Sequence, residues 1–237
     1  MKDFFGNIRG VKAFLSERQD GNMKMFSFGF EKRRKKLLIE KDFEYNRLVS
    51  AKLEHGNKVR IAKSLENQKV FYDYCDGLIT NKPEIILSVT VADCFPVFLF
   101  DSKQKVIGIL HCGWRSVAKN IIENCVDKMR TDFNSKSKNL LISIGPGIQK
   151  CHFQVGKEFI VNFHEYDEFF NFENEKIFFD LNGVIVKKLI FKGIHLKNIE
   201  NDESCTFCNE RLWSYRRDGV DKNGDVQAMI AGIKLKN

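Results

Sequence analysis

An acidic residue and a thiol interrupt an otherwise apolar stretch of the chain. In VTVADCFPVFLFD (residues 89–101), the side chains around Asp93 and Cys94 are β-branched or aromatic, as in a strand covered on both faces. Burying a carboxylate or a thiolate costs free energy unless another group pairs with it. We therefore expect Asp93 and Cys94 to have a bound partner or a chemical role.

Two further stretches place a histidine where the chain turns. GILHCGWRSVAKN (108–120) is typical of a strand that ends near His111 and runs into a helix. Functional groups gather at such strand ends, and Arg115 at the helix start could hold a phosphate through two parallel hydrogen bonds. In LEHGNKV (53–59), His55 precedes a Gly-Asn pair that indicates a turn.

Cys94, His55 and His111 together provide one thiolate and two imidazoles. This donor set suits zinc, and three protein ligands leave a fourth position for water or substrate. Such an open site lowers the pKa of a bound water and polarises an oxygen. Each residue also has an ordinary structural explanation, because single histidines often lie on surfaces and a cysteine in an apolar run acts as a small hydrophobe. Spacing alone leaves both interpretations open.

Asp93 has two candidate roles beside Cys94. It could act as a catalytic acid or base, or it could orient the backbone or a metal ligand. Successive residues of a strand point to opposite faces, so a strand conformation would turn Asp93 away from Cys94 and favour the orienting role. Asp93 remains a catalytic candidate together with Arg115.

The elements that must position these groups do not alternate regularly between strand and helix. Apolar periodicity and capping residues predict strands at 84–94, 96–101, 105–111, 139–148 and 226–235, and helices at 116–130, 155–166 and 180–193. Asp180 and Gly193 are suitable cap residues for the last of these helices. A mixed sheet with helices is favoured over a doubly wound one.

The composition describes an ordinary globular chain. It has 237 residues, 43% of them hydrophobic, and only 3 prolines, so residues 1–237 are expected to form one domain. The absence of a long apolar run and of a secretory signal predicts no membrane association, and seven cysteines without a framework spacing favour the cytoplasm. The net charge of +8 lacks accompanying RNA-binding or zinc-finger motifs, so no nucleic-acid partner is expected. We expect a monomer.

Several motifs, in this order, carry a resemblance to a known family. AFLSERQDGNM (13–23), LEHGNKV, YDYCDGLIT (72–80), VTVADCFPVFLFD, IGILHCGWRS (107–116), SIGPGIQKCHFQVG (143–156) and CTFCNERLWSYRRDG (205–219) resemble the YfiH family of laccase-domain, polyphenol oxidase-like proteins. The likeness runs from about Ala13 to the C-terminus and is most specific in the central motifs.

The resemblance implies a fold, an activity and a set of site residues. The fold would be α+β, a single domain with two mixed β-sheets packed face to face and helices outside, in four layers. Zinc, with copper as the other candidate metal, would be held by His55, Cys94 and His111. The implied activity is purine nucleoside phosphorolysis, in which adenosine, inosine or methylthioadenosine reacts with phosphate, with adenosine deaminase activity at the same site. Arg115, and Arg18 by its place in the first motif, would bind phosphate.

The chain departs from the family pattern at some positions, and other functions use the same residues. Cys112 replaces the alanine of the usual H-A-G-W-R-G, which bears on metal selectivity. A copper polyphenol oxidase would need more than the five histidines present. A metal-free hydrolase could use Cys94 as nucleophile and His111 as base. A binding protein with a degenerate pocket is a third alternative. In the last motif, the C-x-x-C at 205–208 has no second pair, and Arg216, Arg217 and Asp218 are expected to form an ion-pair network.

Overall fold

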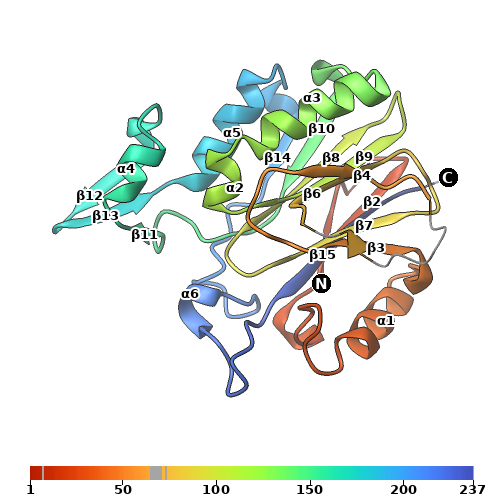
Figure 1. Ribbon diagram of the computed structural model, residues 1–237, viewed down its shortest axis with the longest axis horizontal. Helices are drawn as coiled ribbons and strands as arrows, with labels where there is room; N and C mark the ends of the chain where they lie inside the picture. Colours follow the sequence, from red (N-terminus) through yellow and green to blue (C-terminus); the bar gives the residue numbers. More distant parts are fainter. Residues whose placement is uncertain (7, 65–70, 73, 237) are drawn as a thin grey trace.

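Two six-stranded mixed sheets form the centre of the protein (Figure 1), which a computed structural model describes for residues 1–6, 8–64, 71–72 and 74–236. The first sheet has the order β1 (Lys2–Phe4), β2 (Val11–Leu15), β15 (Met229–Leu235), β7 (Ile86–Val91), β3 (Leu48–Ala51) and β5 (Phe71–Tyr72). The second has the order β14 (Ile199–Asn201), β10 (Leu140–Ile144), β8 (Phe95–Asp101), β9 (Val106–Cys112), β6 (Gly77–Thr80) and β4 (Val59–Ile61). Both contain parallel and antiparallel pairs.

The apolar run of β8 shows how the sheets pack. Phe98 and Phe100 point into the cluster shared with β2, β7 and β15 of the first sheet, whereas Val97 and Leu99 join the cluster beneath the helices on the other face. Alternate side chains are thus buried on both faces, which explains a continuous apolar segment where a half-exposed strand would alternate with polar residues.

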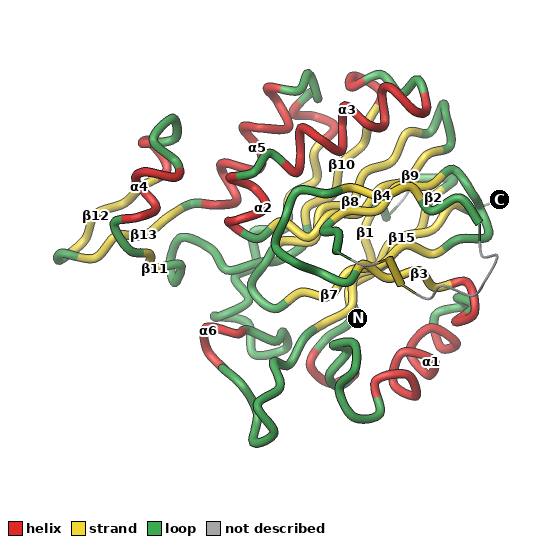
Figure 2. Tube along the Cα trace, in the orientation of Figure 1, coloured by secondary structure: helices red, strands yellow, loops and turns green. Residues whose placement is uncertain are grey.

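Helices cover the outer face of each sheet (Figure 2). Within the described residues, the α-helices are α1 (Phe30–Glu40), α2 (Trp114–Ala118), α3 (Ile121–Phe133), α4 (Glu158–Asn162), α5 (Leu181–Phe191) and α6 (Tyr215–Asp218). Short 3-10 helices are η1 (Arg18–Asp20), η2 (Tyr45–Arg47), η3 (Ser137–Asn139), η4 (Asp167–Phe169) and η5 (Leu196–Asn198). Leu37 and Leu38 of α1 pack on the first sheet, and α3 and α5 pack on the second. The arrangement is the expected α+β fold of four layers, α/β/β/α.

A third, small sheet projects beside α4. It contains β11 (Gln154–Val155), β13 (Lys176–Phe179) and β12 (Phe170–Glu173), and in Figure 1 it lies at the left end of the molecule. The described residues contain no helix with both the length and the apolar character needed to cross a membrane.

Two helix predictions need correction. The helix expected at 116–130 is two helices, because Asn120 adopts a left-handed conformation (φ 64°) that ends α2 and starts α3. The helix expected at 155–166 is confined to α4, since residues 154–155 pair with β13 instead. The helix at 180–193 is confirmed: the Asp180 side chain accepts a hydrogen bond from the Gly183 N–H, and Gly193 has φ 83°.

The break in the central strand carries the chain from one sheet to the other. Residues 92–94 join β7 of the first sheet to β8 of the second, and Pro96 is the second residue of β8, paired with His111. The ADC segment is therefore a link between layers and not part of a strand.

Candidate metal centre

Three distant parts of the chain bring His55, Cys94 and His111 together. His55 follows β3, Cys94 ends the link between the sheets, and His111 lies near the end of β9. Their potential ligand atoms all lie within 4.8 Å of one another, and the two imidazole rings are nearly perpendicular with centroids 4.9 Å apart. The predicted donor set of one thiolate and two imidazoles is thus assembled around one point, and it suits zinc with one position left open.

The backbone leaves room for this cluster at Gly113. A Cβ atom at this position would lie 2.9 Å from Cys94 Sγ and 3.3 Å from His55 Cδ2. Because such a contact is too close, a side chain here would displace the donors. With glycine at this position, the three donors can all lie close enough to bind one ion. The residues therefore fit a bound metal.

Asp76 orients the His111 ring through a hydrogen bond to its Nδ1 atom. Its Oδ1 lies 2.8 Å from His111 Nδ1, and its carboxylate also accepts hydrogen bonds from the N–H groups of Glu54, His55 and Gly56. Burial raises the pKa of this carboxyl, but the hydrogen bond and charge of His111 and the backbone donors lower it below its usual value. The same carboxylate therefore fixes the turn that carries His55 and leaves Nε2 of His111 for a ligand.

Asp76 was missed by the sequence analysis as a functional residue. It belongs to YDYCDGLIT, which carries a family resemblance but no local pattern that indicates a ligand or its support; Asp73 of the stretch lies outside the described residues. A fully buried aspartate with a histidine partner is a strong signal in a structure, but no local spacing links residues 35 positions apart.

Cys94 and His111 stabilise each other's charged forms. Burial raises the pKa of Cys94, but the charge and hydrogen bond of His111, helped by a hydrogen bond from His55, lower it to about 6. Conversely, burial lowers the pKa of His111, while Cys94 and Asp76 raise it to about 10. A thiolate at neutral pH is the form that binds metals.

Asp93 holds three neighbouring loops together. Its Oδ1 accepts a hydrogen bond from Thr206 Oγ1 (2.6 Å), its Oδ2 from the Arg216 N–H (2.6 Å), and its backbone carbonyl from the Ile148 N–H (2.8 Å). The residue has φ 79°, a strained conformation outside a strand, so the expected opposite orientation of Asp93 and Cys94 does not hold; both line the same pocket. With both oxygens engaged by the chain, the orienting role of Asp93 is favoured.

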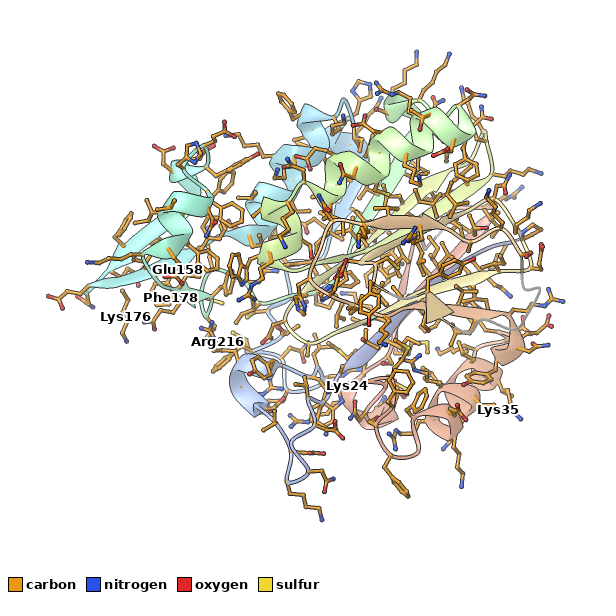
Figure 3. The ribbon with its side chains drawn as sticks, viewed as in Figure 1. Lys24, Lys35, Glu158, Lys176, Phe178 and Arg216 are labelled. Carbon is orange, nitrogen blue, oxygen red and sulfur yellow. The ribbon has the colours of Figure 1, made fainter. Side chains whose placement is uncertain are left out.

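The cluster opens into a pocket of about 580 Å³, which is within the range of small-molecule sites. Its aromatic lining consists of Phe26, Trp114, Phe153 and Tyr215, and its cationic lining of Lys24, Lys52, Arg115 and Arg216. Figure 3 shows Arg216 reaching from α6 toward the segment that enters β11, where its guanidinium donates to the carbonyls of His152 and Gln154. Flat apolar walls and positive charge suit an aromatic ligand and an anion.

The two arginines predicted to bind phosphate are placed differently. Arg115 lines the pocket, lies over the Trp114 ring at 4.3 Å, and makes no hydrogen bond or ion pair with any residue the structure describes. Arg18 is absent from the pocket lining; its guanidinium pairs with Asp218 at 3.1 Å and lies over Trp213. The structure therefore does not bring Arg18 to the donors.

A second hollow, of about 610 Å³, lies against α5. Its lining includes Cys151 and Asn182 but none of the three converging donors. The pocket at Cys94 is the better candidate site, because pocket walls and perturbed titratable groups coincide there.

Comparison with known proteins identifies the family of the chain. The family model described as multi-copper polyphenol oxidoreductase laccase matches residues 30–233. A purine nucleoside phosphorylase of Clostridium acetobutylicum is 33% identical over 149 residues, which cover 61% of each protein. One of Rickettsia conorii is 32% identical over 169 residues, covering 69% of this chain and 67% of the relative. The Clostridium match thus spans less than two thirds of that relative's length.

Solved structures share the whole fold at lower sequence identity. The YfiH protein of Bacillus licheniformis has a TM-score of 0.87 and 24% identity, over 95% of this chain and 93% of that one. YlmD of Geobacillus stearothermophilus has a TM-score of 0.87 and 22% identity, over 96% and 93%. These likenesses establish the four-layer architecture and its topology.

Proposed function

Because the chain belongs to the family of multi-copper polyphenol oxidoreductase laccases, whose matching relatives include purine nucleoside phosphorylases, we propose that it is a metal-dependent purine nucleoside phosphorylase. Its substrates would be adenosine, inosine or methylthioadenosine together with phosphate, and adenosine deamination would use the same pocket. One observation carries the proposal: His55, Cys94 and His111 converge on the wall of a pocket that also holds aromatic rings and the guanidinium of Arg115.

The pocket offers a group for each part of a nucleoside phosphorolysis. Arg115 would bind the phosphate dianion, since its guanidinium presents several N–H donors and, apart from stacking on Trp114, makes no hydrogen bond or ion pair with the described residues. Trp114, Phe153 and Tyr215 would hold the flat base. A phosphate oxygen then forms a bond to the anomeric carbon of the ribose, the bond to the base nitrogen breaks, and the base leaves with the electron pair and takes up a proton.

The metal would be held by His55, Cys94 and His111, with Asp76 fixing His111. When bound, it would supply Lewis-acid chemistry, the polarisation of an oxygen that phosphorolysis and deamination both use. Asp93 would keep the adjacent loops in place and not exchange protons, because both of its oxygens already accept hydrogen bonds from the chain.

Zinc is favoured over a copper oxidase centre. All five histidines lie in the described residues, and only His55 and His111 line this pocket. A blue-copper site together with a multicopper cluster needs more imidazoles than these two. A metal-free cysteine hydrolase remains an outcome of the experiments below, since Cys94 and His111 would form its nucleophile and base.

The role of Arg115 is tested by kinetics. Purified protein is incubated with inosine or adenosine at several phosphate concentrations, and free base and ribose 1-phosphate are quantified. Arg115→Ala should raise the KM for phosphate about 10- to 100-fold, the effect of losing charged hydrogen bonds, and Arg115→Lys should recover part of it. Arg9→Ala, at an exposed arginine elsewhere, is the matched control. An unchanged KM for phosphate in Arg115→Ala would remove this residue from the proposal.

A further inference from the structure

A second group of metal-ligating side chains lies apart from the pocket cluster. The ligand atoms of Cys151, His152, Cys205 and Cys208 lie within 4.8 Å of one another. Cys151 and His152 belong to the turn after β10, and the two other cysteines to the segment between β14 and α6. The fold thus provides the second pair of donors that the C-x-x-C motif at 205–208 lacks in the sequence.

Three distances within this group come close to those of tetrahedral coordination. Cys151 Sγ and Cys208 Sγ are 3.9 Å apart, and His152 Nδ1 lies 3.2 Å from Cys151 Sγ and 3.3 Å from Cys208 Sγ. Bond lengths of about 2.3 Å to sulfur and about 2.0 Å to nitrogen place tetrahedral ligand atoms about 3.5 to 3.8 Å apart. Shifts of a few tenths of an ångström, which the exposed Cys151 and Cys208 side chains can make, would accommodate the ion.

Phe207 and Gln149 orient two of the donors, His152 and Cys205. The His152 ring stacks on Phe207, with centroids 4.1 Å apart and an interplanar angle of 15°. The Gln149 N–H donates to Cys205 Sγ at 3.4 Å, a contact that stabilises a thiolate. Ring orientation and N–H donation to sulfur are both common around metal-bound ligands.

We propose that Cys151, His152, Cys205 and Cys208 form a structural zinc site of the three-cysteine, one-histidine type. Four protein donors complete a tetrahedral shell, so this site has no open position for substrate, unlike the pocket site. A disulfide would use two of the three thiols and leave the third and the imidazole without a role. The convergence of all four donors favours a metal.

The proposed zinc site would brace the wall of the pocket. It would join the turn that carries Ile148 and Phe153 to the segment that carries Thr206 and Arg216, and the last two donate to Asp93 beside Cys94. The Thr206 N–H also donates to the Gly147 carbonyl (3.0 Å), so the two segments already lie side by side. The site would therefore fix, from outside, the loops that surround the pocket donors.

The experiment counts metal ions and does not depend on enzymatic activity. Protein purified under reducing conditions should contain about two zinc ions per chain, one for each donor group. Cys208→Ser should retain only the ion bound by His55, Cys94 and His111. Cys94→Ser should retain only the ion bound by Cys151, His152, Cys205 and Cys208, and the double variant should retain neither. His152→Ala should lower the zinc content, whereas His164→Ala, at an exposed histidine outside both donor groups, should leave it unchanged.

Cobalt spectra assign each ion, even if one variant folds poorly. In Cys94→Ser, the remaining cobalt should show the stronger thiolate-to-metal absorption of three sulfur ligands, and in Cys208→Ser that of a single sulfur ligand. Titration of the unmutated protein with cobalt provides the same count without any substitution. One metal ion per chain with the thiols of Cys151, Cys205 and Cys208 all reactive, or a Cys151–Cys208 disulfide detected by mass, would overturn the proposal.

Discussion

Gly113 is the residue whose small size the pocket cluster most requires. A Cβ atom at this position would point toward Cys94 Sγ, His55 Cδ2 and His111 Cε1, and it would lie 2.9 Å from the sulfur. The three donors themselves come from separate elements, so their mutual distance depends on this point of close approach. The donor set is therefore sensitive to a single methyl group.

Gly113→Ala should weaken metal binding without unfolding the protein. The added methyl displaces the Cys94 thiolate from the histidines, and we expect at least about a tenfold loss of zinc affinity, as for other disturbances of a ligand shell. Competition with a chromophoric chelator measures the affinity. Gly6→Ala, where nothing lies within 4 Å of the added atom, is the control. Equal affinity in Gly113→Ala and the unmutated protein would refute the close-packing argument.

Asp76→Asn tests the carboxylate behind His111. The amide keeps the shape but loses the charge that holds the Nδ1 proton, so zinc affinity should fall about 10- to 100-fold. The N–H groups of His55 and Gly56 also lose their ionic acceptor, which should loosen the turn that carries His55. Asp132→Asn, at an exposed aspartate, serves as the comparison in the same chelator assay. A change confined to stability, with affinity retained, would reduce Asp76 to a structural residue.

Among the elements, the link between β7 and β8 decides where the chemistry lies. It crosses from the first sheet to the second, and this crossing brings Asp93 and Cys94 to a place where loops from the C-terminal part converge. The last of these loops leads into α6, whose Ser214 side chain accepts from the Arg217 N–H as an N-cap. Element ends, more than element interiors, form the site.

Asp218 ties α6 to the N-terminal part of the chain. Its carboxylate accepts hydrogen bonds from the Arg217 and Arg18 side chains and from the Ser214 N–H. The predicted ion-pair network is therefore present for Arg217 and Asp218, with Arg18 as a further member, whereas the Arg216 guanidinium binds backbone carbonyls instead. Arg18 has a structural partner where a phosphate ligand was expected.

The Asp218 network should make stability depend on pH. Burial raises the pKa of Asp218, but Arg217, the Ser214 N–H and Arg18 lower it below its usual value. Because the folded pKa is depressed, the stabilisation is complete above about pH 4 and is lost as the pH falls through the folded value. Asp218→Asn should cost about 1 to 3 kcal/mol in urea unfolding at pH 7, and the difference should shrink toward pH 3.

The comparison variant for this pH series is Asp132→Asn, because Asp132 is exposed and its contacts, an ion pair with Lys128 at 3.5 Å and a hydrogen bond from Thr131 Oγ1 at 3.4 Å, lie at the surface. It should differ little from the unmutated protein at any pH. A deficit in Asp218→Asn that is the same at pH 3 and pH 7 would show that packing, and not the charge of Asp218, makes the difference.

The sequence predicts some of these elements well, for identifiable reasons. The apolar run of 96–101 requires a strand buried on both faces, and Asp180 and Gly193 mark the ends of α5. No sequence pattern indicates that the chain passes from one sheet to the other at 92–94. The strands on either side, β7 and β8, are both apolar and buried, so their composition does not show that they belong to different sheets. The break at Asn120 is hidden because the helical periodicity of 116–130 continues through it.

For the candidate site, residue types alone left the role of the three donors open, and the family resemblance supplied the ligand set without the residues that support it. Thiol and imidazole side chains beside turns make His55, Cys94 and His111 candidate ligands, and the resemblance implies that they act together. Asp76 and Thr206 gain their roles only from contacts made across 35 and 113 positions of the chain. Their partners follow from how the layers pack, which no local pattern contains.

At the scale of the whole molecule, the two sheets and the C-terminal loops surround the pocket that holds the first proposed metal site, and the second proposed site lies outside it, behind the loops that form its wall. The pocket cluster draws its donors from both sheets, since His55 follows a strand of the first and His111 lies in the second. The net charge of +8 favours the approach of anionic phosphate. Metal, anion and aromatic base would meet only in the assembled four-layer fold.

The most direct test of the account is phosphate-dependent release of free base by the purified protein, before and after metal removal. We predict equal amounts of base and ribose 1-phosphate from inosine or adenosine, no base release without phosphate, loss of activity with a chelator and recovery with zinc. Cys94→Ser should be inactive, and Cys125→Ala, at a buried thiol of α3, should stay active. Full activity in metal-free protein or in Cys94→Ser, or phenol oxidation that follows bound copper in place of base release, would contradict the account.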